Sequence, residues 1–482
     1  MSLSHAINAA RSGLQVSGLR ADIVANNVAN ATTPGYVRRS ALLSETLAGP
    51  NSVGVHSDGI ARAGNGGLTA QRQSLSSDLA QASVMASTWQ SISTRVGDTA
   101  AGSGIFGMMS DLASTLKAAE TSPESKTNAT AVIDAARTLA NEFNALADMA
   151  ANQRAEADRE IADGVNVVNR ALKQVEELNT RLSGMDRTSS GAAALMDERQ
   201  RVIDTISEYM PVETVARDYG GVDVVTKEGV YLVGGTARQI EFTPSNNFGP
   251  NQTVDNGTLS GLSVDGLNLT PGATEYSAVS SGMFGALFTL RDNDLPDFTA
   301  QLDTLAGDLM SRLSDSAVDP TKPAGDPGLF VDTAPASGPG LAGRLSVNAA
   351  IDPAKGGEIW RLRDGIGATA EGPPGNSDIL SAMVDALTSA RSLNANGFQG
   401  SFTSSDLAAT FASRTGQSRI SNEAVLSSIS TQHAAAIKAE QAQTGVDVDT
   451  QMQELLLIEQ AYAANARVIE VAGQMVNRLM EL

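Results

Sequence analysis

Cysteine is absent from this chain of 482 residues. Its absence excludes disulfides, thiolate metal sites, iron–sulfur clusters and cysteine nucleophiles. Histidine occurs only three times, which argues against a multi-histidine metal site, and aromatic residues make up only 4% of the chain. We therefore expect no metal and no cofactor, and we expect thin helices packed through small side chains rather than thick aromatic cores.

Positive charge is also scarce, because 34 Lys and Arg residues face 54 Asp and Glu residues, which gives a net charge of −20. A chain this acidic repels phosphate backbones and anionic lipid headgroups. No run of about 18 apolar residues occurs, as a membrane span would require. The first thirty residues also lack the unbroken apolar segment of a secretory signal. The sequence predicts no nucleic-acid partner and no membrane association.

Catalytic motifs are missing or incomplete. Residues 102–107 match the sequence pattern G-x-G-x-x-G of dinucleotide-binding sites. Such a site needs a strand directly before the pattern, and none is predicted here, so we interpret these residues as a joint between helices. No phosphate-binding G-x-x-x-x-G-K-[ST] loop and no G-x-S-x-G elbow is present. Carboxylate pairs such as Asp292 and Asp294 have no histidine or aromatic cleft around them, and we expect them on solvated faces. The sequence therefore predicts no catalytic residue and no enzyme.

Both ends of the chain carry apolar or small residues at alternating spacings of three and four, which is typical of a helix with one packing face. The first series is Leu3, Ile7, Ala10, Leu14, Ser17, Ala21, Val24 and Val28, and it ends before Pro34 and Gly35. The second series is Met452, Leu455, Glu459, Tyr462, Ala466, Ile469, Gly473, Val476 and Met480. Either each helix packs on the central body, or the two pair with one another or with other subunits as a coiled coil.

The charges of the two ends are complementary. Residues 1–40 carry four arginines and one aspartate, a net charge of +3, whereas residues 447–482 carry six acids and two arginines, a net charge of −4. Opposite charges set the orientation of a contact more than its strength. They favour the hypothesis that the terminal helices meet.

Between the ends, the spacing of apolar residues predicts helices over 68–98, 128–183, 192–209, 295–315, 377–393 and 417–442. Valines interleaved with glycines predict short strands and turns over 211–290. The fold class is α+β and multidomain. We expect three domains: 1–40 with 445–482 as a coiled-coil-like terminal domain, 41–210 with 285–444 as an elongated helical bundle that includes irregular 318–365, and 211–284 as a mainly β insertion.

The segment ANNVANATTPGY at residues 25–36 is the most specific motif in the chain. Its asparagines can bond backbone groups where the helix ends, Pro34 and Gly35 enforce an exit turn, and the ring of Tyr36 can anchor the outgoing chain. This motif resembles the N-terminal signature of the axial proteins of the bacterial flagellum, which are the rod, hook and hook-associated proteins.

The C-terminal segment points to one branch of these proteins. Residues 445–449, GVDVD, precede the last apolar helix, and together they resemble the flagellar hook-associated protein 1 family. Residues 195–200, 285–306 and 346–353 are similar to further segments of that family. One departure is the modest size of the β insertion, and another is Glu459 within the terminal apolar series, which makes the register of the helix uncertain.

The resemblance implies a structural component of the flagellum that forms the hook–filament junction by helical self-assembly through its terminal helices. Another hook or rod protein, or a secreted surface adhesin, remains the alternative. The implied partners are further copies in a ring or helical array, the hook protein, a second junction protein next to the filament, and an export chaperone on the C-terminal helix. The implied location is extracellular, after type III export without a cleaved signal.

The residues expected to make subunit contacts are those of the N-terminal motif and of the two terminal apolar series. They are Leu3, Ile7, Leu14, Val24, Asn26, Asn27, Asn30, Pro34, Gly35, Tyr36, Met452, Leu455, Tyr462, Ile469 and Val476.

Overall fold

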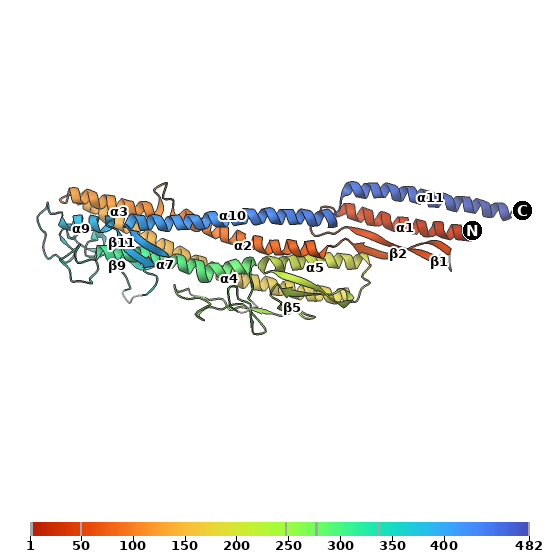
Figure 1. The fold of residues 1–482 in the computed structure, drawn as a ribbon, viewed down its shortest axis with the longest axis horizontal. Coiled ribbons are helices and arrows are strands. Elements are labelled where there is room, and N and C mark those ends of the chain that lie inside the picture. Colours follow the sequence, from red (N-terminus) through yellow and green to blue (C-terminus); the bar gives the residue numbers. More distant parts are fainter. Residues whose placement is uncertain (1–2, 49–50, 246–247, 275–277, 335–337, 481–482) are drawn as a thin grey trace.

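The computed structural model describes residues 3–48, 51–245, 248–274, 278–334 and 338–480. The molecule is elongated, and both termini lie at the same end (Figure 1). That end consists of α1 (Leu3–Ala29), α11 (Val448–Met480) and a hairpin of β1 (Arg39–Ala48) and β2 (Asn51–Arg62). We call these four elements, together with residues 30–38 between α1 and β1, the terminal segment. The remainder of the chain is the body.

The terminal helices pair with one another: α1 packs along α11. Arg20 of α1 forms an ion pair with Glu454 of α11, with 2.9 Å between Nη2 and Oε1. Of the two arrangements that the sequence left open, the pairing of the terminal helices is the one observed. The sixth acid in the charge count, Glu481, lies outside the described residues.

The β1–β2 hairpin was not predicted. Its strands are antiparallel, with register shifts at Leu42/Leu43 and at Thr46/Leu47. Helix α1 lies along β2, and the Ser12 hydroxyl accepts a hydrogen bond of 3.1 Å from the Val55 N–H. Helix α1 therefore lies between α11 and the hairpin, and it contacts both strands of the hairpin (Figure 1).

Long helices form the body. They are α2 (Gly66–Val96), α3 (Gly104–Thr121), α4 (Lys126–Ser183), α5 (Ser190–Tyr209), α7 (Leu295–Leu313) and α10 (Ser404–Thr444). The predicted helices over 68–98, 128–183, 192–209 and 295–315 are confirmed, with ends shifted by about two residues. Helix α4 has 58 residues and thus spans about 87 Å. Its apolar face packs against α3, α5 and α7.

Residues 102–107 form the expected joint between helices. Helix α2 ends at Val96, and α3 begins at Gly104. The φ of Gly104 is +64°, a backbone conformation that glycine adopts readily and other residues rarely do. A Cβ on Gly104 would overlap the carbonyl of Val96. The glycines therefore serve the close approach of two helix ends.

Short strands follow α5, as predicted, but the strand region does not reach residue 290, because residues 282–289 form the helix α6. β3 (Val212–Ala216), β4 (Val222–Thr226) and β5 (Tyr231–Val233) form one antiparallel sheet, with the 3₁₀ turn η1 (Asp218–Gly220) between the first two. β6 (Ile240–Glu241), β7 (Ser263–Val264) and β8 (Leu267–Asn268) form a second sheet. Their buried side chains share one core with α4, α5 and α6 (Gly282–Thr289). The three-domain division remains our prediction.

A π-helical segment, η2 (Leu290–Asp294), joins α6 to α7. At the end of the body remote from the termini lie β9 (Phe330–Asp332), η3 (Ala342–Arg344), β10 (Leu345–Val347), η4 (Pro353–Lys355) and α8 (Arg361–Asp364). They are followed by α9 (Asp378–Thr388) and a hairpin of β11 (Arg391–Ala395) and β12 (Phe398–Phe402).

Two predicted helices had the wrong bounds. The helix predicted over 377–393 ends at Thr388, because the buried Arg312 guanidinium donates to the carbonyls of Ala386 and Ser389 and draws the chain into the β11–β12 hairpin. The helix predicted over 417–442 begins earlier, at Ser404. There Thr403 and Asp406 form a capping box that fixes its start.

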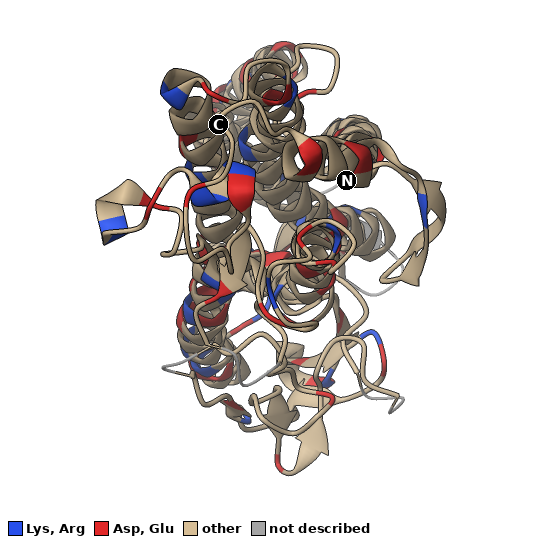
Figure 2. Cartoon of the chain, turned by 90° about the vertical axis from the view of Figure 1, so that its left-hand side faces the viewer, with Lys and Arg blue, Asp and Glu red and all other residues tan. Residues whose placement is uncertain are grey.

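Charge is dispersed over the body. Figure 2, which views the molecule from the end remote from the termini, shows acidic and basic residues interspersed. In the described part of the chain, no helix is both long and apolar enough to cross a bilayer. Among the same residues, no three His, Asp or Glu side chains are grouped so that they could hold a metal ion.

Candidate assembly surface

Asn27 lies at the base of the terminal segment, where α1, the exit segment and α11 meet, and it is fully buried. Its amide donates to the Arg39 carbonyl and to Gln451 Oε1, both at 2.8 Å. Its oxygen accepts from the Tyr36 hydroxyl at 2.8 Å and from the Arg39 N–H at 3.0 Å. All four hydrogen-bonding positions of the amide are thus used. Asn27 joins α1, the exit segment and the start of α11.

Tyr36 and Arg39 extend this network to the body. The Arg39 guanidinium lies 4.8 Å from the centre of the Tyr36 ring and contacts Asp197 of α5 at 3.2 Å. Arg62 at the end of β2 contacts the same carboxylate at 2.6 Å. Burial raises the pKa of the Tyr36 phenol, although Arg39 opposes this effect. The hydroxyl therefore stays protonated and keeps donating to Asn27.

The rest of the motif shapes the helix end. The side chains of Asn26 and Asn30 donate to carbonyls one turn earlier, those of Asp22 and Asn26. Gly35 has a φ of +76°, and a Cβ there would lie 2.7 Å from Cγ of Arg201 in α5. The expected backbone bonding by asparagine, the exit turn and the anchoring of Tyr36 are all observed.

Replacing Asn27 by alanine should loosen the terminal segment from the body. The change leaves the buried Arg39 N–H, the Tyr36 hydroxyl and Gln451 without their partner, which costs about 2–4 kcal/mol. We expect exchange of the Arg39 amide hydrogen to accelerate by about 30-fold or more. Hydrogen–deuterium exchange with mass spectrometry measures this change.

Asn26→Ala is the matched control, because the exposed Asn26 side chain bonds only its own helix. It should leave exchange at Arg39 unchanged. Unchanged protection at Arg39 in Asn27→Ala would contradict the role given to this network.

The contact face of α11 keeps Leu455, Ile469 and Val476 of the predicted series, but its best-buried positions each lie one residue before a predicted one. The best-buried residues on α11 are Gln451, Ile458 and Ala472, at 2%, 3% and 4% exposure. Asn465 lies against Gly13 of α1, where a Cβ would come within 2.6 Å of its amide nitrogen. We call this face the seam.

The predicted contact residues divide between the seam and solvent. Val24 is buried, and Leu3, Ile7 and Leu14 on α1 are half-buried, as are Leu455, Ile469 and Val476 on α11. Met452 and Tyr462, by contrast, are 47% and 51% exposed. The structure therefore brings some of these residues together within one chain, and their contacts with other subunits remain a proposal.

Large apolar side chains remain exposed at the terminal segment. On α11 they are Val448, Met452, Leu456, Leu457, Tyr462, Val468, Val471, Met475 and Met480, and on β1 they are Leu42, Leu43 and Leu47. Contiguous exposed apolar surface on a folded chain marks an interaction site. The terminal segment is therefore the candidate assembly surface.

Several residues of this region were missed from the sequence. Gln451, Arg39, Arg62 and Asp197 are polar, and they meet only because segments up to 424 positions apart in the chain come together. Asp197 does lie in the family-like segment at 195–200. That resemblance was the one signal that could have singled it out.

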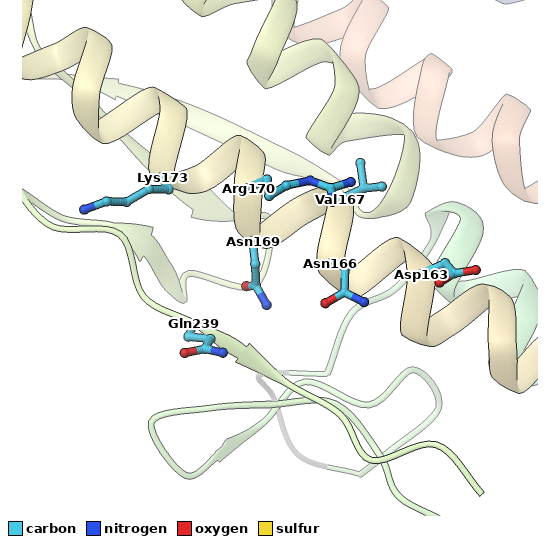
Figure 3. Close-up of a pocket in the computed structure, with 7 residues that line it drawn as sticks. All are labelled: Asp163, Asn166, Val167, Asn169, Arg170, Lys173 and Gln239. Carbon is cyan, nitrogen blue, oxygen red and sulfur yellow. The ribbon is translucent and has the colours of Figure 1, made fainter. Parts of the chain in front are cut away.

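The described part of the body has open grooves along its helices. Figure 3 shows one beside α4, between Asn166, Asn169, Arg170 and Gln239. Asn169 exchanges two hydrogen bonds, of 2.8 and 2.9 Å, with the backbone of Ile240. Its amide is thus engaged in holding β6 on α4.

The expectation that Asp292 and Asp294 lie on solvated faces was wrong. Both are partly buried, and burial raises the pKa of each carboxyl group. Asp292 bonds Arg291, and Asp294 accepts from the Trp89 indole at 3.2 Å. These bonds give both carboxylates a role in packing α7 and the π-helical segment.

Comparison with known proteins begins at the N-terminal motif. Residues 7–36 match the family model described as "Flagella basal body rod protein". This match places the segment of α1 and its exit turn in the class of flagellar axial proteins.

A second model, "Flagellar hook-associated protein FlgK helical domain", matches residues 71–327, which is more than half of the chain. The chain belongs to this FlgK family.

Two curated relatives, both named "Flagellar hook-associated protein 1", illustrate the similarity. The one from Salmonella typhimurium is 25% identical over 314 residues, which cover 63% of this chain and 55% of the relative. The one from Bacillus subtilis is 20% identical over 513 residues, which cover 98% of this chain and 97% of the relative. The match thus spans only about half the length of the Salmonella relative.

A solved structure, that of the flagellar hook junction protein FlgK from Burkholderia pseudomallei, is also similar. It is 21% identical with a TM-score of 0.44, over 55% of this chain and 47% of that chain.

Proposed function

We propose that this protein is a structural, non-catalytic component of the bacterial flagellum that forms the hook–filament junction by helical self-assembly through its terminal segment. Membership of the FlgK family supports the location. The observation that carries the mechanism is the exposed apolar surface of α11 and β1, which a free monomer leaves in water. Burial of that surface between subunits supplies the driving force.

The proposed partners follow the axis of the flagellum. Further copies of the chain form a ring or helical array, the hook protein lies on one side, and a second junction protein next to the filament lies on the other. An export chaperone covers α11 before assembly, and the chain is exported to an extracellular location. Residues 26–36 and the two terminal helices make the subunit contacts.

The resemblance to rod proteins over residues 7–36 keeps one alternative, a hook or rod protein, which would share the N-terminal motif. The other alternative, a surface adhesin, would bind as a folded monomer and would not need its terminal helices. These classes differ in what is lost when the gene is deleted.

Electron microscopy of cells deleted for this gene, with a blot for flagellin in the medium, tests the proposal. We expect hooks without filaments and flagellin released into the medium. Missing hooks would move the protein to the rod or hook class. Normal filaments would refute a junction role and would favour the alternative that the protein is a surface adhesin.

A further inference from the structure

The terminal segment has two unpartnered apolar margins. The first is a second series on α11 with spacings of four and three, Leu457, Ala461, Ala464, Val468, Val471 and Met475, all exposed. It is displaced by one residue, or about 100°, from the seam that contacts α1. We call it the free stripe. The second margin is β1, whose exposed Leu43 and Leu47 share one face, whereas the exposed Leu42 lies on the other face; we call β1 the leucine strand.

These margins belong to opposite sides of the terminal segment. Because α1 lies between α11 and the hairpin, the free stripe and the leucine strand of one chain are kept apart (Figure 1). The outward edge of β2 is already covered, since its Val55 N–H bonds Ser12 and its Ile60 N–H bonds the Thr188 carbonyl. The edge of β1 is thus the free edge of the hairpin.

We propose that the leucine strand of one copy packs against the free stripe of the next copy. This inference rests on the proposed self-assembly and names the surfaces that meet. Leu43 and Leu47 are about 13 Å apart along β1, and the free stripe from 457 to 475 spans about 27 Å, so both leucines fit within the length of the stripe. Because the two surfaces differ, the contact is head-to-tail and propagates into a ring or helix.

The levels of the two margins along the molecule also agree. Gly54, which pairs with Thr46, lies against Ser12, and the neighbouring Gly13 lies against Asn465. Leu47 follows Thr46 by one residue on β1, and Val468 follows Asn465 by three residues on α11. Leu47 and Val468 therefore lie at about the same level along the molecule. Copies placed side by side bring these two residues together without an axial shift.

Charge supports the same pairing. Glu45 lies between Leu43 and Leu47, and Arg467 flanks the free stripe beside Val468. Both are exposed, and within the described part of the chain neither takes part in an ion pair. The proposed contact places this unpaired acid next to this unpaired base in a neighbouring copy.

Engineered cysteines test the contact cleanly, because the chain has no cysteine of its own. Cells lacking the gene are complemented with Leu47→Cys, Val468→Cys or both, and assembled flagella are isolated, oxidised and run on non-reducing gels. We expect a ladder of dimers and higher oligomers from the double variant, and monomers from each single variant. Restored motility shows that the variants fold and assemble.

The matched control combines Leu47→Cys with Ala466→Cys, because Ala466 is exposed at the same level but on the other flank of α11. It should stay monomeric. Motile cells in which the double variant gives no ladder, or in which Val468→Cys alone gives dimers, would overturn this contact and leave the junction role intact. Normal filaments in the deletion strain would instead refute the junction role itself.

Charge exchange gives a second readout. Glu45→Arg alone and Arg467→Glu alone should each reduce swimming, because each places like charges together in the contact. The two changes combined should restore it. Absence of mutual rescue in variants with normal thermal unfolding would contradict the pairing of Glu45 with Arg467.

Discussion

Replacing Ile458 by aspartate should release α11 from α1 while the body remains folded. Ile458 is 3% exposed, and among the described residues of α11 only Gln451 and Ala472 are comparably buried. The substitution removes the best-buried large apolar side chain of the seam and places a charge there. We expect a loss of about 3–5 kcal/mol in the α1–α11 contact.

Hydrogen–deuterium exchange should show loss of protection along α11, with protection of α4 unchanged. Gln460→Asp adds the same charge at an exposed position of the same helix and should leave α11 protected. If Ile458→Asp keeps α11 protected and assembles normally, the seam does not hold the terminal segment together.

Replacing Arg291 by alanine should have the largest effect within the body. The side chain is fully buried and contacts Asp158 at 2.5 Å, Asp292 at 2.9 Å and the Ser260 carbonyl at 3.0 Å. Asp158, 1% exposed, also accepts from the Ser245 N–H. Removing the guanidinium leaves a buried carboxylate unpaired, which costs about 3–5 kcal/mol.

The expected consequence is local: residues 248–260 should detach from α4 and become sensitive to protease before the body unfolds. Thermal denaturation should also begin at lower temperature. Arg238→Ala is the control, since its pair with Asp265 is largely exposed and is worth at most about 1 kcal/mol. Equal effects of the two substitutions would show that the buried cluster does not hold this segment.

The long helices could be predicted because burial repeats along them with a regular period. The apolar residues of α4 from Ile161 to Leu182 face a single core, so their spacing alone defines the helix. The short strands after Pro211 were predictable from valines between glycines, although their pairing was not. The N-terminal motif was predictable in its local geometry, because its bonds lie within a few residues of one another.

The seam on α11 could not be located from the sequence. Leu455, Ile458, Ile469 and Ala472 form one apolar series, and Leu457, Val468, Val471 and Met475 form another, one residue earlier. A helix that is apolar on two adjacent sides satisfies either register, and only the position of α1 decides between them. The β1–β2 hairpin escaped prediction for a related reason, since its two exposed sides leave no clear alternation of apolar and polar residues.

The polypeptide passes between the terminal segment and the body only twice, at residues 63–65 and 445–447. Asn65 donates to Gln443 at 2.6 Å, and the Arg38 N–H donates to the Thr444 carbonyl at 2.8 Å, so the two passages are tied together. A pulling force along the molecule is carried by covalent bonds at this neck. A sideways force is opposed by the ion pairs of Arg39 and Arg62 with Asp197 and by the hydrogen bond from the Ile60 N–H to the Thr188 carbonyl. We therefore expect bending of the molecule to concentrate at this neck.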